Sequence, residues 1–383
     1  MFMTEFPLKE FASIKTPFYY YDKKLLVATL DAIKKASPEA EYHVHYAIKA
    51  NANPEILKYI CEAGFGVDCV SEGEIRAALN AGFPASGIVF AGVGKSDSEI
   101  DFALDNDIAC FNVESLPELQ LIEEMAADKS KIANVALRVN PDIDAHTHHY
   151  ITTGLEENKF GIDLKMLDEA IAYCAKQPSL RLIGLHFHIG SQILTLEPFK
   201  VLCDRINQLV DKYKDQGIHF ESINVGGGLG VDYDNPDANP IPDFKSYFDI
   251  FRTNLKLEQG MQLHFELGRS IVAQCGSLIT KVLYVKEGLK KKFVIVDAGM
   301  TDLIRPALYQ AHHKIQNLTS KYTENGVYDV VGPICESSDC FGTDETLPIT
   351  QRGDLLAIRS AGAYGEIMAS QYNCRALPGS VFN

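Results

Sequence analysis

Short apolar runs alternate regularly with longer amphipathic segments between residues 25 and 267, and this alternation restricts the fold more than any other feature of the chain. The apolar runs, FGVDCV and NVALRVN among them, have the length and the β-branched content of buried strands. The segments between them, such as PEILKYICEAG, carry apolar residues at helical spacing. About eight strand–helix pairs in about 240 residues fit a TIM (β/α)8 barrel, and a doubly wound open sheet is the alternative that periodicity leaves open.

Beyond residue 267 the sequence changes to strand-like runs joined by turns, with little helix. The runs are SIVAQCGSLITKVLYVKEG, KKFVIVDAG, VYDVVGPIC and RGDLLAIRSAG. The amino-terminal TPFYYYD is also strand-like and is expected to join them. We therefore predict an α/β chain with two domains: a barrel over residues 25–267, and a β-rich domain, a small barrel or sandwich, built from residues 1–24 and 268–383.

The composition narrows the classes of partner and the cellular compartment. The 383 residues include 36 Lys and Arg against 51 Asp and Glu, a formal net charge of −15, which disfavours nucleic acid and anionic membranes as partners. No apolar run is long enough to span a bilayer. The nine cysteines form no CxxC pair, so neither a disulfide framework nor a metal site is expected. With no signal-peptide pattern in MFMTEFPLKE, this cysteine usage predicts a cytoplasmic protein.

Unusual residues stand at the ends of several predicted barrel strands, where the chemistry of TIM barrels is located. Lys49 follows the apolar YHVHYAI, and Asp68 lies in the next strand. HFHIGSQ, which contains His188 and Ser191, ends the sixth strand. GGGLG (226–230) ends the seventh strand and ELGR, beginning at Glu266, ends the eighth.

Each of these features has a simpler explanation when taken alone. Lys49 could be the first exposed residue after a strand, His188 a core histidine, and Glu266 the ion-pair partner of Arg269; the glycines could form only a tight turn. In a closed barrel, however, the strand ends converge on one mouth. A lysine amine, an imidazole, a glycine turn and a carboxylate in one site fit pyridoxal 5′-phosphate, which offers an aldehyde, a ring face, a phosphate and a pyridine nitrogen.

The motifs YAIKAN, HFHIGSQI, GGGLG, ELGR and GAYG resemble those of the alanine-racemase-fold, pyridoxal-phosphate-dependent decarboxylases, and the resemblance covers nearly the whole chain. RPALYQAHH (305–313) and CESSD (335–339) are similar to the branch of this family that decarboxylates meso-2,6-diaminopimelate to L-lysine and CO2, the last step of lysine biosynthesis. Two departures are Leu267, where the family usually has proline, and the shortened tail CRALPGSVFN. Neither departure removes a residue of the expected chemistry.

The resemblance implies a role for each residue of the predicted cofactor site. Lys49 would attach the cofactor covalently, Glu266 would keep its pyridine nitrogen protonated, and His188 would stack on its ring. The other cofactor-binding residues that the resemblance implies are Asp68, Ser191, Gly227, Gly228, Gly268, Arg269 and Tyr364.

The resemblance also implies how the substrate is bound and how the reaction ends. The residues implied for substrate binding are Arg269, Arg305, Tyr309, Glu336 and Tyr364. The two arginines would bind the distal carboxylate and Glu336 the distal ammonium. Cys335 would donate the proton that takes the place of CO2. In the resembling family the loop with Cys335 reaches the partner's active site, so a homodimer with shared active sites is expected.

Three alternatives stay open at this point. They are a decarboxylase of ornithine or carboxynorspermidine type, an amino-acid racemase of the same fold, and a non-catalytic carrier of the cofactor. The arginine-rich set favours diaminopimelate, because ornithine has no distal carboxylate for a guanidinium to bind. The second domain and CESSD disfavour a carrier, which needs no residues to bind a substrate.

Overall fold

The computed structural model describes residues 5–141 and 159–383, which divide into two compact units. The barrel unit comprises residues 30–230 and 243–268. The β unit comprises the amino-terminal segment up to residue 29, residues 231–242 and residues 269–383. The short segment 231–242 therefore groups with the β unit although it interrupts the barrel sequence.

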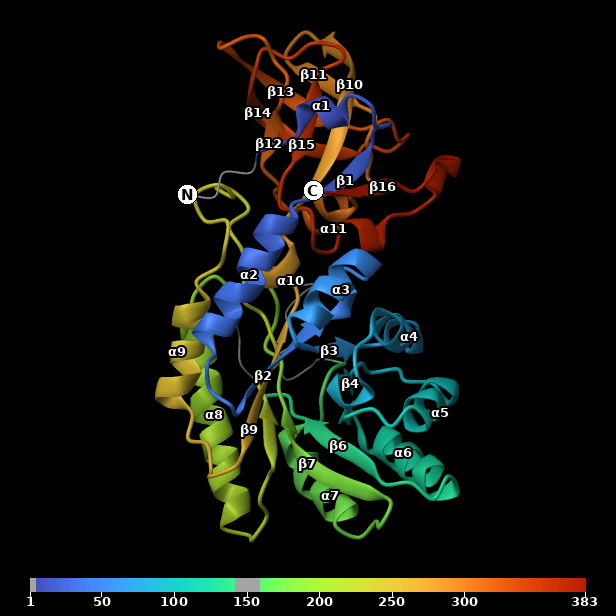
Figure 1. The fold of residues 1–383 in the computed structure, drawn as a ribbon, viewed down its shortest axis with the longest axis vertical. Helices are drawn as coiled ribbons and strands as arrows, with labels where there is room; N and C mark the ends of the chain where they lie inside the picture. Colours follow the sequence, from blue (N-terminus) through green and yellow to red (C-terminus); the bar gives the residue numbers. More distant parts are fainter. Residues whose placement is uncertain (1–4, 142–158) are drawn as a thin grey trace. The chain divides into compact units, whose positions relative to one another are not determined.

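Eight parallel strands close into a barrel in the order β2-β3-β4-β5-β6-β7-β8-β9 (Figure 1). Closure is completed by β2 and β9, whose register places His45 beside Glu266. The predicted TIM barrel is confirmed, and the open sheet is excluded because the first and last strands pair. The strands are β2 (Tyr42–Ala47), β3 (Gly66–Cys69), β4 (Ile88–Phe90), β5 (Cys110–Val113), β6 (Ala133–Arg138), β7 (Leu180–His186), β8 (Ser222–Asn224) and β9 (Gln262–Leu267).

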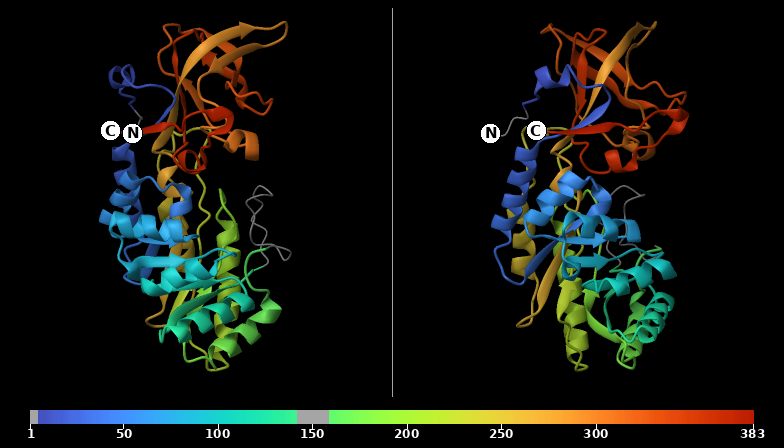
Figure 2. Two further views of the ribbon diagram at one scale, coloured as in Figure 1. Left: turned by 90° about the vertical axis from the view of Figure 1, so that its right-hand side faces the viewer. Right: turned by 45° about the vertical axis from the view of Figure 1, so that its right-hand side comes forward.

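Helices follow the strands and lie on the outside of the barrel (Figures 1 and 2). Their ends follow the signals in the sequence: the Ser71 side chain caps α4 at the Glu74 N–H, and Gly82 ends that helix with a positive φ of 96°. The helices are α2 (Lys23–Ala36), which precedes β2, α3 (Pro54–Glu62), α4 (Glu72–Ala81), α5 (Asp97–Asp105), α6 (Leu116–Asp128), α7 (Leu164–Cys174), α8 (Glu197–Lys214) and α9 (Phe244–Asn254), with short 3-10 turns η1 (Ile48–Ala50) and η2 (Ala85–Gly87).

The β unit is built on one mixed sheet of eight strands. Its long strand β10 pairs with β1 and β15 along its first half and with β11 along its second, with a register shift between Val282 and Tyr284. The strands are β1 (Phe18–Tyr21), β10 (Gly276–Glu287), β11 (Lys292–Val296), β12 (Ile315–Asn317), β13 (Asn325–Val331), β14 (Cys340–Pro348), β15 (Leu355–Ile358) and β16 (Gly379–Phe382). The expectation that TPFYYYD joins this sheet is confirmed, because β1 pairs with both β10 and β16.

Two details of the β unit differ from the expectation. The run that begins SIVAQCG starts as a helix, α10 (Arg269–Val272), and the strand begins only at Gly276. Strands β12, β14 and β16 were not expected; β12 and β16 are short, and the β14 sequence CFGTDETLP is polar with several residues facing solvent. The unit's other helical segments are α1 (Leu8–Phe11), α11 (Arg305–Tyr309), η3 (Glu366–Met368) and η4 (Tyr372–Cys374).

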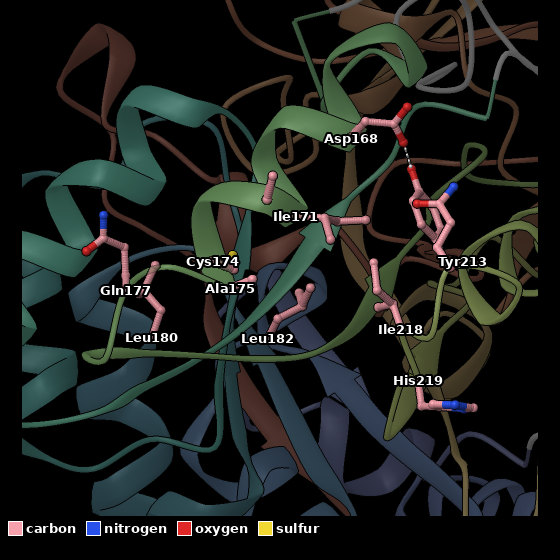
Figure 3. Close-up of a pocket in the computed structure, with 12 residues that line it drawn as sticks. Asp168, Ile171, Cys174, Ala175, Gln177, Leu180, Leu182, Tyr213, Ile218 and His219 are labelled. Carbon is pink, nitrogen blue, oxygen red and sulfur yellow. Dashed lines mark hydrogen bonds between the residues drawn. The ribbon is translucent and has the colours of Figure 1, made fainter.

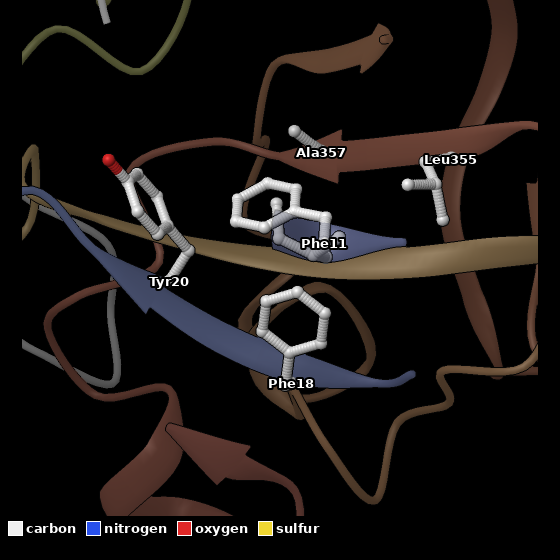
Figure 4. Close-up of a cluster of buried hydrophobic side chains, with 6 residues drawn as sticks. Phe11, Phe18, Tyr20, Leu355 and Ala357 are labelled. Carbon is white, nitrogen blue, oxygen red and sulfur yellow. The ribbon is translucent and has the colours of Figure 1, made fainter. Parts of the chain in front are cut away.

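An aromatic cluster forms one core of the β unit and fixes its amino-terminal segment (Figure 4). The Phe11 ring meets the rings of Phe18 and Tyr20 edge to face, each with centroids 5.2 Å apart. Leu355 and Ala357 of β15 belong to the same cluster. Burying this apolar surface holds residues that are far apart in the sequence on one sheet.

Candidate active site

Lys49 lies just past the end of β2, in the 3-10 turn η1. Its Nζ is 3.4 Å from Oδ2 of Asp68 in β3. The Lys49 side chain is 41% exposed, whereas that of Asp68 is fully buried. Lys49 is therefore neither a buried core lysine nor a plain surface lysine, because its amine contacts a carboxylate inside the barrel.

Glu266 in β9 accepts hydrogen bonds from three other strands. Its Oε1 accepts from Nδ2 of Asn224 (2.7 Å) and of Asn112 (3.1 Å), and its Oε2 lies 3.1 Å from Nε2 of His186. Burial alone would raise the pKa of Glu266, but His186 and Lys49 lower it below the usual range. Burial and the charge of Glu266 raise the pKa of Asp68 to about 8, against the opposing effect of Lys49. The barrel thus holds one fixed negative charge beside a second carboxyl group that can be protonated.

Sequence reasoning missed the three side chains that hold Glu266. Asn112 is in β5, His186 ends β7 and Asn224 ends β8, and all three are buried. The available signal was a polar residue near the carboxyl end of each strand: Asn112 in CFNV, His186 in LRLIGLH and Asn224 in SIN. Buried polar groups need partners, so such residues are candidates for a shared polar centre, but the sequence does not identify which of them meet.

The glycine turn follows β8 directly and packs too closely for side chains. Gly226 and Gly228 have φ values of 69° and 113°. A Cβ on Gly227 would lie 1.9 Å from the backbone oxygen of Glu266. Gly268, just after β9, is less confined, since its Cβ would lie 3.2 Å from the Cβ atoms of Ala47 and Ala50 on either side of Lys49. The tight packing explains why glycine is needed here.

His188 and Ser191 lie in the loop after β7, which pairs with the glycine turn. The N–H of Gly227 donates to Nδ1 of His188 over 3.3 Å, and the N–H of Ile193 donates to the Gly228 oxygen over 2.8 Å. The proton of the neutral ring is therefore on Nε2. Burial, with the nearby Arg138 and Lys49, lowers the pKa of His188 well below its usual value. The side chains of His188 and Ser191 are both partly exposed, so His188 is not a core histidine.

In the β unit, Tyr233 contacts both arginines predicted to bind the substrate, Arg269 and Arg305. Nη1 of Arg269 donates to the Tyr233 hydroxyl over 2.7 Å, and the Arg305 guanidinium lies 4.9 Å from the centroid of the Tyr233 ring. Arg269 also lies 4.9 Å from the ring centroid of Tyr364. Tyr309 is partly exposed and ends α11, the helix that Arg305 begins. Sequence reasoning missed Tyr233, which lies 36 residues before Arg269 in the chain.

Arg305 is buried, and its surroundings do not neutralise it. Nη1 donates to Nε2 of His313 over 2.8 Å, while Nε has no hydrogen-bond partner. Within residues 5–141 and 159–383, no carboxylate forms an ion pair with Arg305. A buried guanidinium without a counter-ion is costly unless an anionic ligand completes the site.

Cys335 and Glu336 lie in an exposed loop between β13 and β14. The core role that cysteines usually have does not apply to Cys335, because its side chain is exposed. Buried Asp339 closes the base of the loop, where its carboxylate accepts from the N–H groups of Met300 and Ile334, each over 2.6 Å. The Tyr372 hydroxyl donates to Glu336 over 2.8 Å.

Two cavities lie at the other end of the barrel, where strands begin. One, of about 780 Å³, is bordered by Lys34, His43, His45 and His264. The second, of about 440 Å³, lies where β7 begins, and the hydrogen bond from Tyr213 to Asp168 (2.7 Å) runs along it (Figure 3). None of the predicted site residues borders either cavity.

The described part of the chain contains no group of His, Cys, Asp and Glu side chains arranged to hold a metal ion. Among the helices of residues 5–141 and 159–383, none has the length and apolar character needed to cross a membrane.

A family model and individual relatives place the chain in the same family. Residues 24–273 match the family described as "Pyridoxal-dependent decarboxylase, pyridoxal binding domain". The diaminopimelate decarboxylase of Bacteroides thetaiotaomicron is 61% identical over 374 residues, which cover 97% of each chain. The enzyme of Aquifex aeolicus is 41% identical over 98% of this chain and 88% of its own.

Solved structures agree with this assignment. The diaminopimelate decarboxylase from Helicobacter pylori, complexed with L-lysine, superposes with a TM-score of 0.92 at 43% identity, covering 98% of this chain and 93% of that one. A lysine/ornithine decarboxylase from Vibrio vulnificus has a TM-score of 0.85 at 20% identity, covering 98% and 96%, and shows the shared fold alone. The chain belongs to the diaminopimelate decarboxylases, within the family of pyridoxal-dependent decarboxylases.

Proposed function

We propose that the protein decarboxylates meso-2,6-diaminopimelate to L-lysine and CO2 with pyridoxal 5′-phosphate as cofactor, the last step of lysine biosynthesis. The substrate carries two amino-acid ends. One end loses CO2, and the other end must be bound so that only one orientation reacts. The observation that carries the substrate assignment is Arg305, a buried guanidinium with an unpartnered Nε and no carboxylate beside it in the described residues.

The barrel residues fit the cofactor. Glu266 is ionised, buried and fixed by three donors, which suits a protonated pyridine nitrogen. The turn at Gly226–Gly228 leaves no room for side chains, which suits the close approach of a phosphate to backbone N–H groups. Lys49 provides a primary amine within reach of solvent at the end of β2. The residues that would hold the cofactor are Lys49, Asp68, His188, Ser191, Gly227, Gly228, Glu266, Gly268, Arg269 and Tyr364.

Pyridoxal phosphate, when bound, supplies an electron sink for the pair of electrons left on carbon as CO2 departs. The chain supplies the rest. Glu266 provides a fixed negative charge that keeps the ring nitrogen protonated, and the amides of Asn112 and Asn224 keep that carboxylate in place. His188 would lie against the ring as a neutral imidazole, and Lys49 would bind the cofactor and yield its place to the substrate amine.

We propose that Arg305 and Arg269 bind the distal carboxylate, with Tyr309 and Tyr364 supplying hydroxyl contacts and Glu336 pairing with the distal ammonium. The planar guanidinium matches a carboxylate in two parallel hydrogen bonds, which a diamine-forming substrate such as ornithine cannot make. The Arg305→Ala variant should weaken binding of diaminopimelate by about 10²-fold, the scale of a buried contact to a charged group. An unchanged affinity would mean that the distal end binds elsewhere.

Product analysis tests the function as a whole. The purified protein with pyridoxal phosphate should release CO2 and L-lysine in equal amounts from meso-diaminopimelate and form no putrescine from ornithine. Putrescine as the main product would favour the ornithine-type alternative, and epimerised substrate without CO2 would favour a racemase. No product from any of these substrates, despite bound cofactor, would favour a carrier.

We propose a homodimer with shared active sites, in which Cys335 and Glu336 of each chain enter the partner's site. The proposal is supported by the exposure of both side chains on a loop whose base Asp339 fixes. Cys335 would then donate the proton to the carbon that lost CO2. Mixing inactive Lys49→Ala and Cys335→Ala chains should restore up to about a quarter of the activity, because mixed dimers have one intact site. No recovery after proven subunit exchange would contradict shared sites.

We further propose that the cofactor-binding domain spans residues 25–267, with residues 1–24 and 268–383 forming the β-rich domain. We also propose a cytoplasmic location, because all nine cysteines are free thiols and a reducing compartment keeps thiols free. Two of them, Cys335 and Cys374, are exposed.

A further inference from the structure

His313 ends the RPALYQAHH motif, yet the proposed chemistry gives it no role. Its side chain is fully buried in the β unit. Nε2 lies 2.8 Å from Nη1 of Arg305, and Nδ1 lies 2.9 Å from the backbone oxygen of Arg359. Both ring nitrogens are therefore used, one on each neighbour.

The two partners fix which ring nitrogen carries the proton. A guanidinium can only donate and a backbone carbonyl can only accept. Nδ1 must therefore donate to Arg359, which leaves the lone pair on Nε2 for Arg305. Burial and the charge of Arg305 lower the pKa of His313 to about 3, so the ring stays neutral and keeps this acceptor across the physiological range.

A neutral acceptor orients Arg305 without neutralising it. A carboxylate at this position would form a salt bridge and compete with an anionic ligand, whereas an imidazole leaves the whole positive charge available. The Tyr233 ring packs against both groups. Its centroid lies 4.9 Å from the Arg305 guanidinium and 5.1 Å from the centroid of the His313 ring, which it meets nearly edge to face. Arg305 is thus positioned by the ring nitrogen of His313 and by the side chain of Tyr233.

We propose that His313 is a positioning residue that holds Arg305 in the orientation needed to bind the distal carboxylate of the substrate. The inference rests on the proposed function, in which Arg305 binds that group. In this role the contact of Nε2 with Arg305 orients the guanidinium. The contact of Nδ1 with the backbone oxygen of Arg359 fixes the tautomer that leaves Nε2 free to accept. The role is one of substrate selection, so it should appear in ligand binding.

Two substitutions separate the two contacts. His313→Gln places an amide oxygen near the position of Nε2 and keeps an acceptor for Arg305. His313→Asn places an amide N–H near the position of Nδ1 and keeps the donor for Arg359, but it leaves Arg305 without its acceptor. The two variants are both neutral amides, so they differ mainly in which neighbour they can still bind.

The ligands are chosen so that only one depends on Arg305. L-Lysine retains the carboxylate that Arg305 would bind, and cadaverine is the same chain without a carboxylate. Inhibition constants of both amines are measured against meso-diaminopimelate on the holoenzyme, for the wild type, both His313 variants and Arg305→Ala. Cadaverine reports on the intactness of the site in each variant.

We expect His313→Asn to raise the lysine constant about tenfold, as for a lost hydrogen bond to a charged group, with the cadaverine constant unchanged. His313→Gln should keep the lysine constant within about threefold of the wild type. If His313→Asn does not fold, His313→Leu takes its place, with the same expected loss. Equal effects of the Gln and Asn variants on lysine, or parallel weakening of lysine and cadaverine, would overturn the inference.

Arg305→Ala separates this inference from the proposed function. If Arg305→Ala weakens lysine and not cadaverine while the His313 variants change neither, the substrate assignment stands and the positioning role of His313 is wrong. If Arg305→Ala leaves lysine binding unchanged, the assignment of Arg305 fails and the role of His313 fails with it.

Discussion

At the carboxyl end of the barrel strands, His186 contacts the carboxylate of Glu266; toward the amino end, His45 contacts a second histidine, His264, over 2.8 Å. The first pair is completed by two amide donors, which keep a negative charge in place. In the second pair burial dominates and lowers the pKa of His45 to about 4 and of His264 to about 3, so both are neutral at pH 7. Histidine therefore stabilises a fixed negative charge at the carboxyl end of the barrel and forms an uncharged contact at the amino end.

The comparison explains why cavity size is a poor guide to chemistry in this barrel. The cavity at the amino end is large, at about 780 Å³, and it contains three histidines and Lys34. It lacks, however, a carboxylate among its lining residues. The carboxyl end combines an ionised carboxylate, an amine and a glycine turn, which together can bind and activate one cofactor.

The largest effect is expected for Glu266→Gln. The amide fits the same site, because its oxygen can still accept from Asn112 and Asn224 and its N–H can donate to His186 if that ring changes tautomer. The loss of the negative charge should lower kcat by about 10³-fold or more while cofactor binding is largely kept, since the charge acts on the transition state. Steady-state kinetics and cofactor absorbance check this, and near-normal kcat would contradict the assignment.

A smaller but clear effect is expected for Gly227→Ala. The new methyl group would lie 1.9 Å from the backbone oxygen of Glu266, so the glycine turn has to move. Affinity for pyridoxal phosphate, measured by titration of the apoprotein, should fall by about tenfold or more. Gly94→Ala is the matched control, because its Cβ would meet no atom within 4 Å. Equal affinities in the two variants would show that the turn does not shape the phosphate site.

The Asp68→Asn variant tests the carboxyl end of the barrel through the pH dependence of the free energy of unfolding. In the folded apoprotein the pKa of Asp68 is raised to about 8, above its unfolded value of about 4, so the folded state holds a proton that the unfolded state releases. The stability contributed by Asp68 is present below pH 4 and is lost as the pH rises toward 8. The stability of Asp68→Asn relative to the wild type should therefore increase by about 3 to 4 kcal/mol from pH 5 to pH 8. Urea unfolding of both apoproteins measures this, and a difference that does not vary with pH would contradict it.

The smallest effect is expected at the amino end. His264→Asn keeps a polar atom near the position of Nδ1, which contacts His45. Because neither ring is charged at pH 7 and neither belongs to the proposed site, kcat and KM should stay within about twofold of the wild type, as for most substitutions away from a site. A tenfold loss of activity in folded protein would break the distinction between the two ends.

Much of the fold and the centre of the site follow from local sequence patterns. Lys49, Asp68 and Glu266 could be found because each stands at or near the end of an apolar strand, and parallel strands bring such ends together. Asn112 and Asn224 could not be singled out, since one polar residue in a buried strand has many possible partners. Their importance is visible only once β5 and β8 lie beside the same carboxylate.

The β unit was harder to predict, for a physical reason. Its contacts join residues that are distant in sequence: Tyr233 meets Arg269 and Arg305, and β1 pairs with β10. Segment 231–242, which sequence order places inside the barrel, groups instead with the β unit. Local propensity carries no information about such long-range pairings.

Reduction of the holoenzyme with borohydride, followed by peptide mass mapping, tests most directly where the chemistry is located. Lys49 and Lys34 provide the contrast, since Lys49 follows β2 at the carboxyl end and Lys34 borders the cavity at the amino end. The account predicts that the mass of the reduced cofactor appears on the peptide that contains Lys49 and on no other. Label on the peptide of Lys34, or on any lysine other than Lys49, would contradict it.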